Sequence, residues 1–332
     1  MTRSNGGSSS RDLVLEHLRI ADRLVLATHE RPDGDALGSL TGMQRVLSAL
    51  GKDVLAYVAP DEFPLPTEYR WIEIGNLITE PPTDLAERTV VFLDCGNIDR
   101  TKASALRHDG ERILNLDHHH DNTLFGDVNH VVADASCTAE IVWDLMDDLG
   151  VDLDAATGEA LYVGLVTDTG RFMYENTTAR SHLMAAEIIQ AGVDVHEVYR
   201  RLYEGIPAGK LTLLARGLAN LRRYDGGVLT LSQLSRRDFE EAAADESFSE
   251  GVVDHLRALE GTAVAGLVRE LATPAPPVLR KVSLRATDDR VDVSSIARAM
   301  GGGGHRRAAG FSTELELPEL VEFLRREVGH QL

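Results

Sequence analysis

The 332-residue sequence predicts an α/β protein in which a doubly wound, mainly parallel sheet domain is followed by a second, smaller α/β domain. Three observations support this prediction. Short apolar runs alternate with helical patterns over the first 190 residues, and two of these runs end on an aspartate. A charged helical stretch then precedes a second alternating region. A chain of this length can form two domains that each bury a core.

The first alternating region supplies the strands of the larger sheet. The apolar run RLVLAT at 23–28 predicts a buried strand, and ALGSLTGMQRVLSALG at 36–51 predicts a helix. The further strands expected are DVLAYVA (53–59), TVVFLD (89–94) and RILNLD (112–117), and the further helices lie near 137–149, 155–167 and 178–191. Functional residues of such sheets gather beyond the carboxyl ends of the strands, which is where His29, Asp94 and Asp117 stand.

The rest of the sequence predicts how the chain divides. We expect a disordered tail over residues 1–10, a first domain over 11–192, a charged helical connector over 193–224 and a second domain over 225–332. The second domain is expected to contain strands VLTLSQL (228–234), AVAGLVREL (263–271) and VLRKVSLRA (278–286), with helices near 236–244, 250–258 and 317–328.

Composition limits the classes of function. The net charge of −19 would repel a long polyanion such as duplex nucleic acid, so a phosphate-bearing partner should be short and held by local cations. No apolar stretch approaches the roughly 20 residues that cross a bilayer, and the amino-terminal MTRSNGGSSSR lacks the apolar stretch of a secretory signal. We therefore expect a cytoplasmic protein without a membrane partner. Cys95 and Cys137 lack CxxC spacing, which argues against a disulfide framework and a zinc knuckle.

The segment HERPDGDALGS follows the first strand and carries three candidate metal ligands, His29, Asp33 and Asp35. Pro32 and Gly34 are turn residues, so one loop can aim these side chains inward. Imidazole with carboxylates suits Mn²⁺, Fe²⁺ or Zn²⁺ better than the all-oxygen site of Ca²⁺. The alternative is that PDGD forms a surface turn and Asp35 caps the next helix.

Further candidate ligands stand at the ends of other elements. Asp94 ends a strand in VVFLDCGN, the NLDHHHD segment ends another with Asp117, His118 and His119, and Asp168 closes an apolar helix in VGLVTDTG. Each alone can be a cap, a solvated loop or a helix stop. Together they are hard to explain as caps, because burying so many carboxylates near one another is costly unless cations neutralise them. Two metal ions would do so.

The segments HERPDGD, VFLDCGN, LDHHH and TDTG, followed by GGGGHRRAAG at 301–310, resemble the four motifs of the DHH phosphoesterase superfamily and the glycine-rich motif of its DHHA1 domain. Within the superfamily, the sequence is most similar to the NrnA-like group of oligoribonucleases and 3′-phosphoadenosine 5′-phosphate (pAp) phosphatases. The resemblance covers nearly the whole chain after the tail. It implies a DHH catalytic domain over 11–192 and a DHHA1 substrate-binding domain over 225–332.

The resemblance also implies two divalent cations, for which we expect Mn²⁺, with Mg²⁺, Co²⁺ and Fe²⁺ as alternatives. One cation would be held by His29, Asp33 and Asp94, and the second by Asp35, Asp94, His118 and Asp168, so that Asp94 bridges the pair. Asp117 would orient a neighbouring ligand. His119 would face the substrate phosphate, and the catalytic set implied is Asp94, Asp117 and His119.

For the second domain, the sequence leaves a flexible linker and an anion-binding loop open as interpretations of the four glycines. The resemblance implies substrate contacts from Arg285, Gly302, Gly303, Gly304, His305 and Arg306. Whether Arg306 or Arg307 points inward stays open. Phe172 and Tyr174 are expected either to stack on a base or to pack in the core.

The function implied is a metal-dependent phosphohydrolase that degrades very short oligoribonucleotides to mononucleotides and dephosphorylates pAp to AMP. Its partners would be short oligonucleotides and small nucleotides, and a homodimer stays open. One alternative is a phosphodiesterase for cyclic dinucleotides or their linear products, and another is a nucleotide-sensing module without turnover. An inorganic pyrophosphatase is disfavoured because that family lacks the glycine-rich loop found at 301–304.

Overall fold

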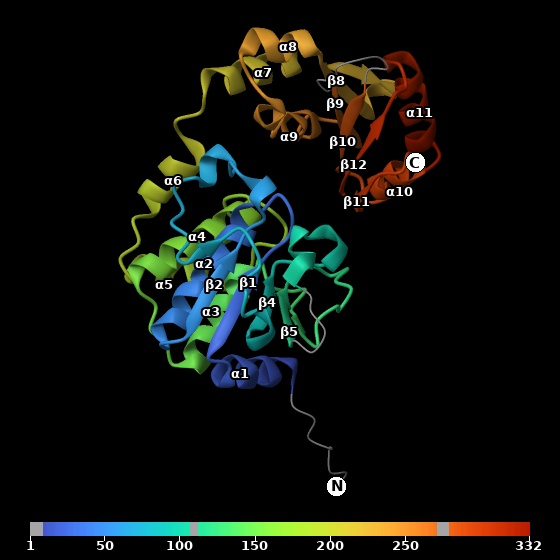
Figure 1. The fold of residues 1–332 in the computed structure, drawn as a ribbon. Helices are drawn as coiled ribbons and strands as arrows, with labels where there is room; N and C mark the ends of the chain where they lie inside the picture. The colour runs from blue at the N-terminus through green and yellow to red at the C-terminus, as the bar shows by residue number, and fades with distance from the viewer. Residues whose placement is uncertain (1–8, 107–111, 271–278) are drawn as a thin grey trace. The chain divides into compact units, whose positions relative to one another are not determined.

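The computed structural model describes residues 9–106, 112–270 and 279–332. The chain forms two compact units, Met1–Glu204 and Gly205–Leu332 (Figure 1). The division falls inside the expected connector, with helix α6 (Val195–Tyr203) in the first unit and α7 (Ala208–Ala219) in the second. Residues 1–8 of the expected tail lie outside the described residues, and helix α1 begins at Ser10.

The first unit contains a six-stranded sheet in the order β3-β2-β1-β4-β5-β6, in which every described pair of neighbours is parallel. Its strands are β1 (Arg23–Ala27), β2 (Asp53–Tyr57), β3 (Leu77–Ile78), β4 (Thr89–Leu93), β5 (Ile113–Asp117) and β6 (Val128–Val131). The strand order reverses between β1 and β4, and such switch points are where α/β sheets bind ligands. The expected parallel α/β fold is confirmed.

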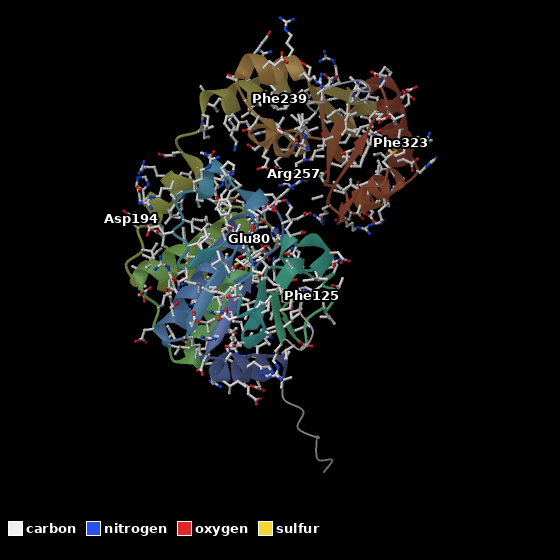
Figure 2. All side chains as sticks on the ribbon, viewed as in Figure 1. Glu80, Phe125, Asp194, Phe239, Arg257 and Phe323 are labelled. Carbon is white, nitrogen blue, oxygen red and sulfur yellow. The ribbon has the colours of Figure 1, made fainter. Side chains whose placement is uncertain are left out.

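The two faces of this sheet are covered differently. One face packs against α1 (Ser10–Ile20), α2 (Gly34–Ala49) and α3 (Thr138–Leu149). Helix α4 (Ala155–Asp168) packs on α2 and α3, and α5 (Ala179–Gln190) packs on α3 and α4. The other face is covered by short 3₁₀ turns, from which Leu85, Ile98 and Leu106 pack onto the strands. On that face the ring of Phe125, labelled in Figure 2, packs edge-on against Phe92 with ring centroids 5.3 Å apart.

Helices α2 and α4 approach each other closely because glycines line their contact. A Cβ atom added to Gly38 would lie 2.5 Å from the carbonyl oxygen of Ala160, and one added to Gly34 would lie 2.3 Å from Oγ1 of Thr167. The start of α2 therefore lies against the end of α4. This contact places Asp35, in the first turn of α2, beside Asp168, the last residue of α4.

The second unit contains another six-stranded sheet, in the order β11-β12-β10-β9-β8-β7. Its strands are β7 (Arg222–Tyr224), β8 (Leu229–Leu234), β9 (Val264–Glu270), β10 (Arg280–Ala286), β11 (Gly303–His305) and β12 (Ala308–Thr313), and only β8 and β9 pair in parallel among the described strands. Helices α10 (Val293–Ala299) and α11 (Leu317–Gly329) cover one face, and α7, α8 (Arg236–Ala242) and α9 (Val252–Arg257) cover the other. In the described part of the chain, none of the helices has the length and apolar character needed to cross a membrane.

We expect Gly38→Ala to lower the free energy of unfolding of the first unit by about 1–3 kcal/mol, because an added methyl group would meet the backbone of α4 at the Ala160 carbonyl. Urea denaturation measures the loss. The matched control is Gly329→Ala near the end of α11, where an added Cβ meets nothing within 4 Å. If both variants unfold at the wild-type urea concentration, the close contact of α2 and α4 is not a packing constraint.

Candidate active site

The side chains that follow β1, β4 and β5 meet the end of α4 in one cluster. Three groups in this cluster have ligand atoms within 4.8 Å of one another: His29 with Asp33 and Asp94, Asp94 with His118 and His119, and Asp35 with His118 and Asp168. The structure therefore brings together all six side chains that the sequence analysis names as metal ligands. They come from loops and helices that are far apart in the chain.

Asp94 lies at the centre of the cluster. Its backbone adopts a left-handed φ of 57°, and its side chain is 3% exposed. One carboxylate oxygen, Oδ2, lies 3.4 Å from Nε2 of His29, and the other, Oδ1, lies 3.6 Å from Nε2 of His118. Burial alone would raise the pKa of Asp94, but the hydrogen bond with His29 and the charges of the nearby histidines outweigh burial and lower it. The two oxygens thus face two different groups of ligands.

The hydrogen bonds of His29 and His118 leave the Nε2 atom of each ring facing the carboxylates. Nδ1 of His29 lies 2.7 Å from the carbonyl oxygen of Glu30, and Nδ1 of His118 lies 3.4 Å from that of Ala135. A carbonyl can only accept, so Nδ1 carries the proton in both rings. This is the arrangement that prepares Nε2 of a histidine to bind a metal.

His119 is held differently. Its Nδ1 lies 2.8 Å from Oδ1 of Asp117, a fully buried carboxylate that also accepts a hydrogen bond of 2.6 Å from Nδ2 of Asn122. Asp117 therefore fixes the orientation of the His119 ring through Nδ1. The Nδ1 atoms of His118 and His119 therefore have different partners, although the two rings lie 4.7 Å apart and both approach Asp94.

Asp35 is buried and accepts three hydrogen bonds. The donors are the backbone N–H groups of Thr138, at 2.6 Å, and Ala139, at 2.9 Å, together with Oγ of Ser39, at 3.1 Å. Asp35 was one candidate for the cap of α2, but the capping residue is Asp33, which accepts from the N–H groups of Asp35 and Ala36. That alternative is wrong, and the side chain of Asp35 instead serves the first turn of α3.

Histidines are the basic partners of the cluster carboxylates in the described residues. Among the residues that the structure describes, no lysine or arginine pairs with Asp35, Asp94 or Asp168. Burial and the charge of Asp94 raise the pKa of Asp35 well above its ordinary value and that of Asp168 to about 8. The site thus combines imidazole nitrogens with carboxylate oxygens whose negative charge is not fully balanced. This set of donors fits divalent transition metals.

Comparisons with known proteins show the family of the chain. The model of the DHH family, N-terminal domain, matches residues 23–169, and that of the DHHA1 domain matches residues 231–330. The chain belongs to the DHH family. The family resemblance seen in the motifs is thereby confirmed.

Two relatives and two solved structures illustrate the similarity to this DHH protein. The bifunctional oligoribonuclease and PAP phosphatase NrnA of Thermus thermophilus is 33% identical over 96% of this chain and 94% of its own length. The protein of the same name from Bacillus subtilis is 25% identical over 90% of this chain and 92% of its own length. An exopolyphosphatase-related protein from Bacteroides fragilis, 22% identical, superposes with a TM-score of 0.88 over 99% of this chain and 98% of its own. RecJ in complex with Mn²⁺ from Thermus thermophilus, 15% identical, superposes with a TM-score of 0.58 over 99% of this chain and 55% of its own. The two solved structures support the fold alone.

The glycine-rich motif of the DHHA1 domain forms a hairpin of β11 and β12, so the linker interpretation is wrong. Gly302 and Gly304 are required by packing, since an added Cβ would lie 2.2 Å from the carbonyl oxygen of Gly310 and 2.5 Å from that of Ala308, respectively. A Cβ added to Gly303 would meet nothing within 4 Å. A Cβ added to Gly301 would also meet nothing within 4 Å, but Gly301 precedes the strand, so Gly303 is the glycine of β11 that has open space beside it.

The basic residues expected to contact substrate lie on or near this hairpin. The strand register aligns Arg285 of β10 with Ala308 of β12, and Ala308 with His305 of β11. Arg285 has Nε 3.6 Å from Oδ1 of Asp254 in α9. Arg306 and Arg307, at the hairpin turn, donate to the backbone carbonyl and the carboxylate of Asp289, respectively.

The two aromatic residues after TDTG have different surroundings. Phe172 packs against the core of the first unit and stacks on His182, with ring centroids 4.9 Å apart. Tyr174 is 47% exposed, and its ring covers Gly170. The core interpretation therefore applies to Phe172. Cys95 and Cys137 are buried free thiols.

Three polar residues that contact the cluster could not be predicted from the sequence. Thr138 donates from Oγ1 to Oδ1 of Asp94 at 3.0 Å, and Asn176 donates from Nδ2 to Oδ2 of Asp168 at 3.2 Å. Asn122 contacts Asp117. Each lies in a polar stretch without a distinctive pattern, and its contact depends on segments that meet only in the folded chain.

We expect the EDTA-treated protein to lose stability between pH 6.5 and pH 9. Burial alone lowers the pKa of His29 and His119, but hydrogen bonds to Asp94 and Asp117 and nearby negative charges raise both from 6.5 to about 9. A histidine with a raised pKa stabilises the fold fully below its unfolded pKa, and this contribution is lost as the pH rises through the folded pKa. Asp168, whose pKa is raised to about 8, also stabilises the fold less as the pH rises, because its proton is lost over the same interval.

Unfolding temperatures measured in EDTA and in Mn²⁺ across this pH interval test the expectation. Mn²⁺ should remove the loss, because it binds the deprotonated ligands. An unfolding temperature in EDTA that rises over the interval would contradict the charge balance described above.

Proposed function

We propose that this DHH protein is a metal-dependent phosphohydrolase that degrades very short oligoribonucleotides to mononucleotides and dephosphorylates pAp to AMP in the cytoplasm. The observation that carries the proposal is the group formed by the buried Asp35 and Asp94 and the half-buried Asp168, none of which pairs with a lysine or arginine in the described residues. The relatives named as bifunctional oligoribonuclease and PAP phosphatase support this choice of substrates.

In this proposal the cluster holds two divalent cations, with Mn²⁺ as the expected metal. His29, Asp33 and Asp94 hold one, and Asp35, Asp94, His118 and Asp168 hold the other. Two such cations lower the pKa of a water molecule and stabilise the attacking and leaving oxygens of an in-line displacement. The side chain of Asp94 is suited to serve both, because its two oxygens face His29 and His118 separately.

His119 and Asp117 complete the proposed catalytic set with Asp94. Asp117, which accepts a hydrogen bond from Asn122, holds the His119 ring through Nδ1. The hydrogen bond to Asp117 favours the protonated ring, and a protonated ring donates from Nε2. His119 therefore binds and orients the phosphate, or delivers a proton to the leaving oxygen.

The DHHA1 domain is proposed to hold the rest of the nucleotide. Arg285 and His305 belong to one cross-strand row, and Gly303 leaves its backbone open to an approaching anion. Gly302 and Gly304 shape the same hairpin, and Arg306 lies at its turn. The net charge of −19 repels long polyanions, so the chain suits a short substrate with few phosphates.

Product analysis with Mn²⁺ tests the proposed function. The substrates are pAp, oligoribonucleotides from two to about ten residues, linear and cyclic dinucleotides, and pyrophosphate. We expect AMP from pAp and mononucleotides from the shortest oligonucleotides, with turnover that stops in EDTA. Turnover restricted to cyclic or linear dinucleotides would favour the phosphodiesterase alternative, and metal binding without turnover of any substrate would favour a sensing module.

His118→Ala and His119→Ala should separate metal binding from phosphate contact. His118→Ala should lose bound Mn²⁺, because Nε2 of His118 faces Asp94 and Asp168. His119→Ala should keep its Mn²⁺ while turnover falls by about 10²–10⁴-fold, the usual range for a positioned proton-transfer group. Metal analysis and turnover of pAp measure both effects, and His196→Ala on the exposed face of α6 is the control. If His119→Ala lost Mn²⁺ and His118→Ala kept it, His119 would be the metal ligand and His118 the phosphate contact.

A further inference from the structure

The first turn of α3 contacts two proposed metal ligands that belong to different elements. Thr138, the first residue of the helix, is fully buried. Its hydroxyl donates to Oδ1 of Asp94 at 3.0 Å, and its backbone N–H donates to Oδ2 of Asp35 at 2.6 Å. One residue therefore holds a carboxylate that follows strand β4 and another that begins helix α2.

Asp35 replaces the capping side chain that α3 lacks. Cys137 stands at the N-cap position and makes no capping hydrogen bond through its side chain. The N–H groups of Thr138 and Ala139 donate to Asp35 instead. Exposed N–H groups at a helix amino terminus stabilise negative charge, so α3 favours the ionised form of a carboxylate that burial disfavours.

The contacts of Asp35 leave it little freedom as a ligand. Oδ1 accepts from Ala139 N and Ser39 Oγ, and Oδ2 accepts from Thr138 N. A carboxylate has about four lone-pair sites, so about one site, on Oδ2, remains for a cation. The direction of that site is fixed by the start of α3.

The hydroxyl of Thr138 sets the orientation of Asp94 in a similar way. A carboxylate rotates readily about its last side-chain bond, which would exchange Oδ1 and Oδ2. The Thr138 hydroxyl holds Oδ1 on the side of His118, while Oδ2 stays on the side of His29. Both contacts of Thr138 therefore act on ligands of the same proposed cation, the one shared by Asp35, Asp94, His118 and Asp168.

We infer that Thr138 is a positioning residue that prepares this second cation site by orienting Asp94 through its hydroxyl and Asp35 through its backbone N–H. The inference rests on the proposed two-cation function. Thr138 acts through Asp35 and Asp94 and not on the substrate. Valine has nearly the same shape as threonine and keeps the N–H, so Thr138→Val removes only the contact with Asp94.

Titration of each protein with Mn²⁺, followed by the electron paramagnetic resonance signal of free Mn²⁺, tests the inference without substrate. Thr138→Val should weaken one of two Mn²⁺ sites by about 10–100-fold, the usual effect of losing a group that orients a metal ligand. Thr138→Ser keeps the hydroxyl and should bind both ions as the wild type does. The matched control is Thr230→Val in β8, a fully buried threonine whose hydroxyl lies 2.8 Å from that of Thr262 in the second unit.

Unfolding temperatures in EDTA check that the variants are folded. If Thr138→Val does not fold, Thr138→Ala and Thr138→Ser form the pair that decides, since only the serine keeps the hydroxyl. The inference is overturned if the folded valine or alanine variant binds both ions as the wild type does, if serine weakens the site as much as valine, or if both sites weaken equally. A wild-type protein that binds fewer than two Mn²⁺ would instead refute the two-cation function on which the inference rests.

Discussion

The mutual repulsion of buried carboxylates is the constraint on which the rest of this structure depends. Asp94 raises the pKa of both Asp35 and Asp168, and in the described residues only histidines offer these three groups positive charge. A buried carboxylate is tolerated when it is neutral, paired or fully hydrogen-bonded. The protein supplies hydrogen bonds through Thr138, Ser39 and Asn176, and it leaves the charge to be balanced from outside.

The parallel sheet concentrates these groups through its register. Ala27 of β1 lies opposite Phe92 of β4, so the residues two positions further on, His29 and Asp94, emerge side by side. Leu93 of β4 likewise lies opposite Leu116 of β5, which brings Asp94 next to Asp117. The strand register thus brings the ligands at the strand ends together. The close contact between α2 and α4 brings Asp35 and Asp168 together in the same way.

The sequence was sufficient to predict the parts of this site that follow an apolar strand. RLVLAT and TVVFLD end one residue beyond β1 and β4, and RILNLD ends with β5, so His29, Asp94 and Asp117 lie at the strand ends as expected. Weakly patterned elements were missed. Strand β6 has one buried residue in four, β3 has two residues, and α1 follows a polar tail.

Contacts between different elements could not be predicted from the sequence either. Asp33 and Asp35 both precede an apolar helix pattern, and either could cap it by local rules. Only the packing of α3 against α2 gives Asp35 two N–H donors from another helix and leaves the cap of α2 to Asp33. Thr138 escaped notice for the same reason, because its role is defined by side chains more than 40 residues away.

The glycine-rich motif shows why a pattern alone is weak evidence for a binding site. Gly302 and Gly304 would be required whether or not a ligand binds, because an added Cβ at either position would collide with the neighbouring strand β12. They account for the shape of the hairpin and not for its chemistry. A Cβ added to Gly303 would meet nothing within 4 Å, and Arg285 lies in the same sheet two strands away from β11. The packing of the hairpin does not require either residue. Anion binding by the DHHA1 domain is therefore to be sought at these two residues, and the number of glycines is no evidence for it.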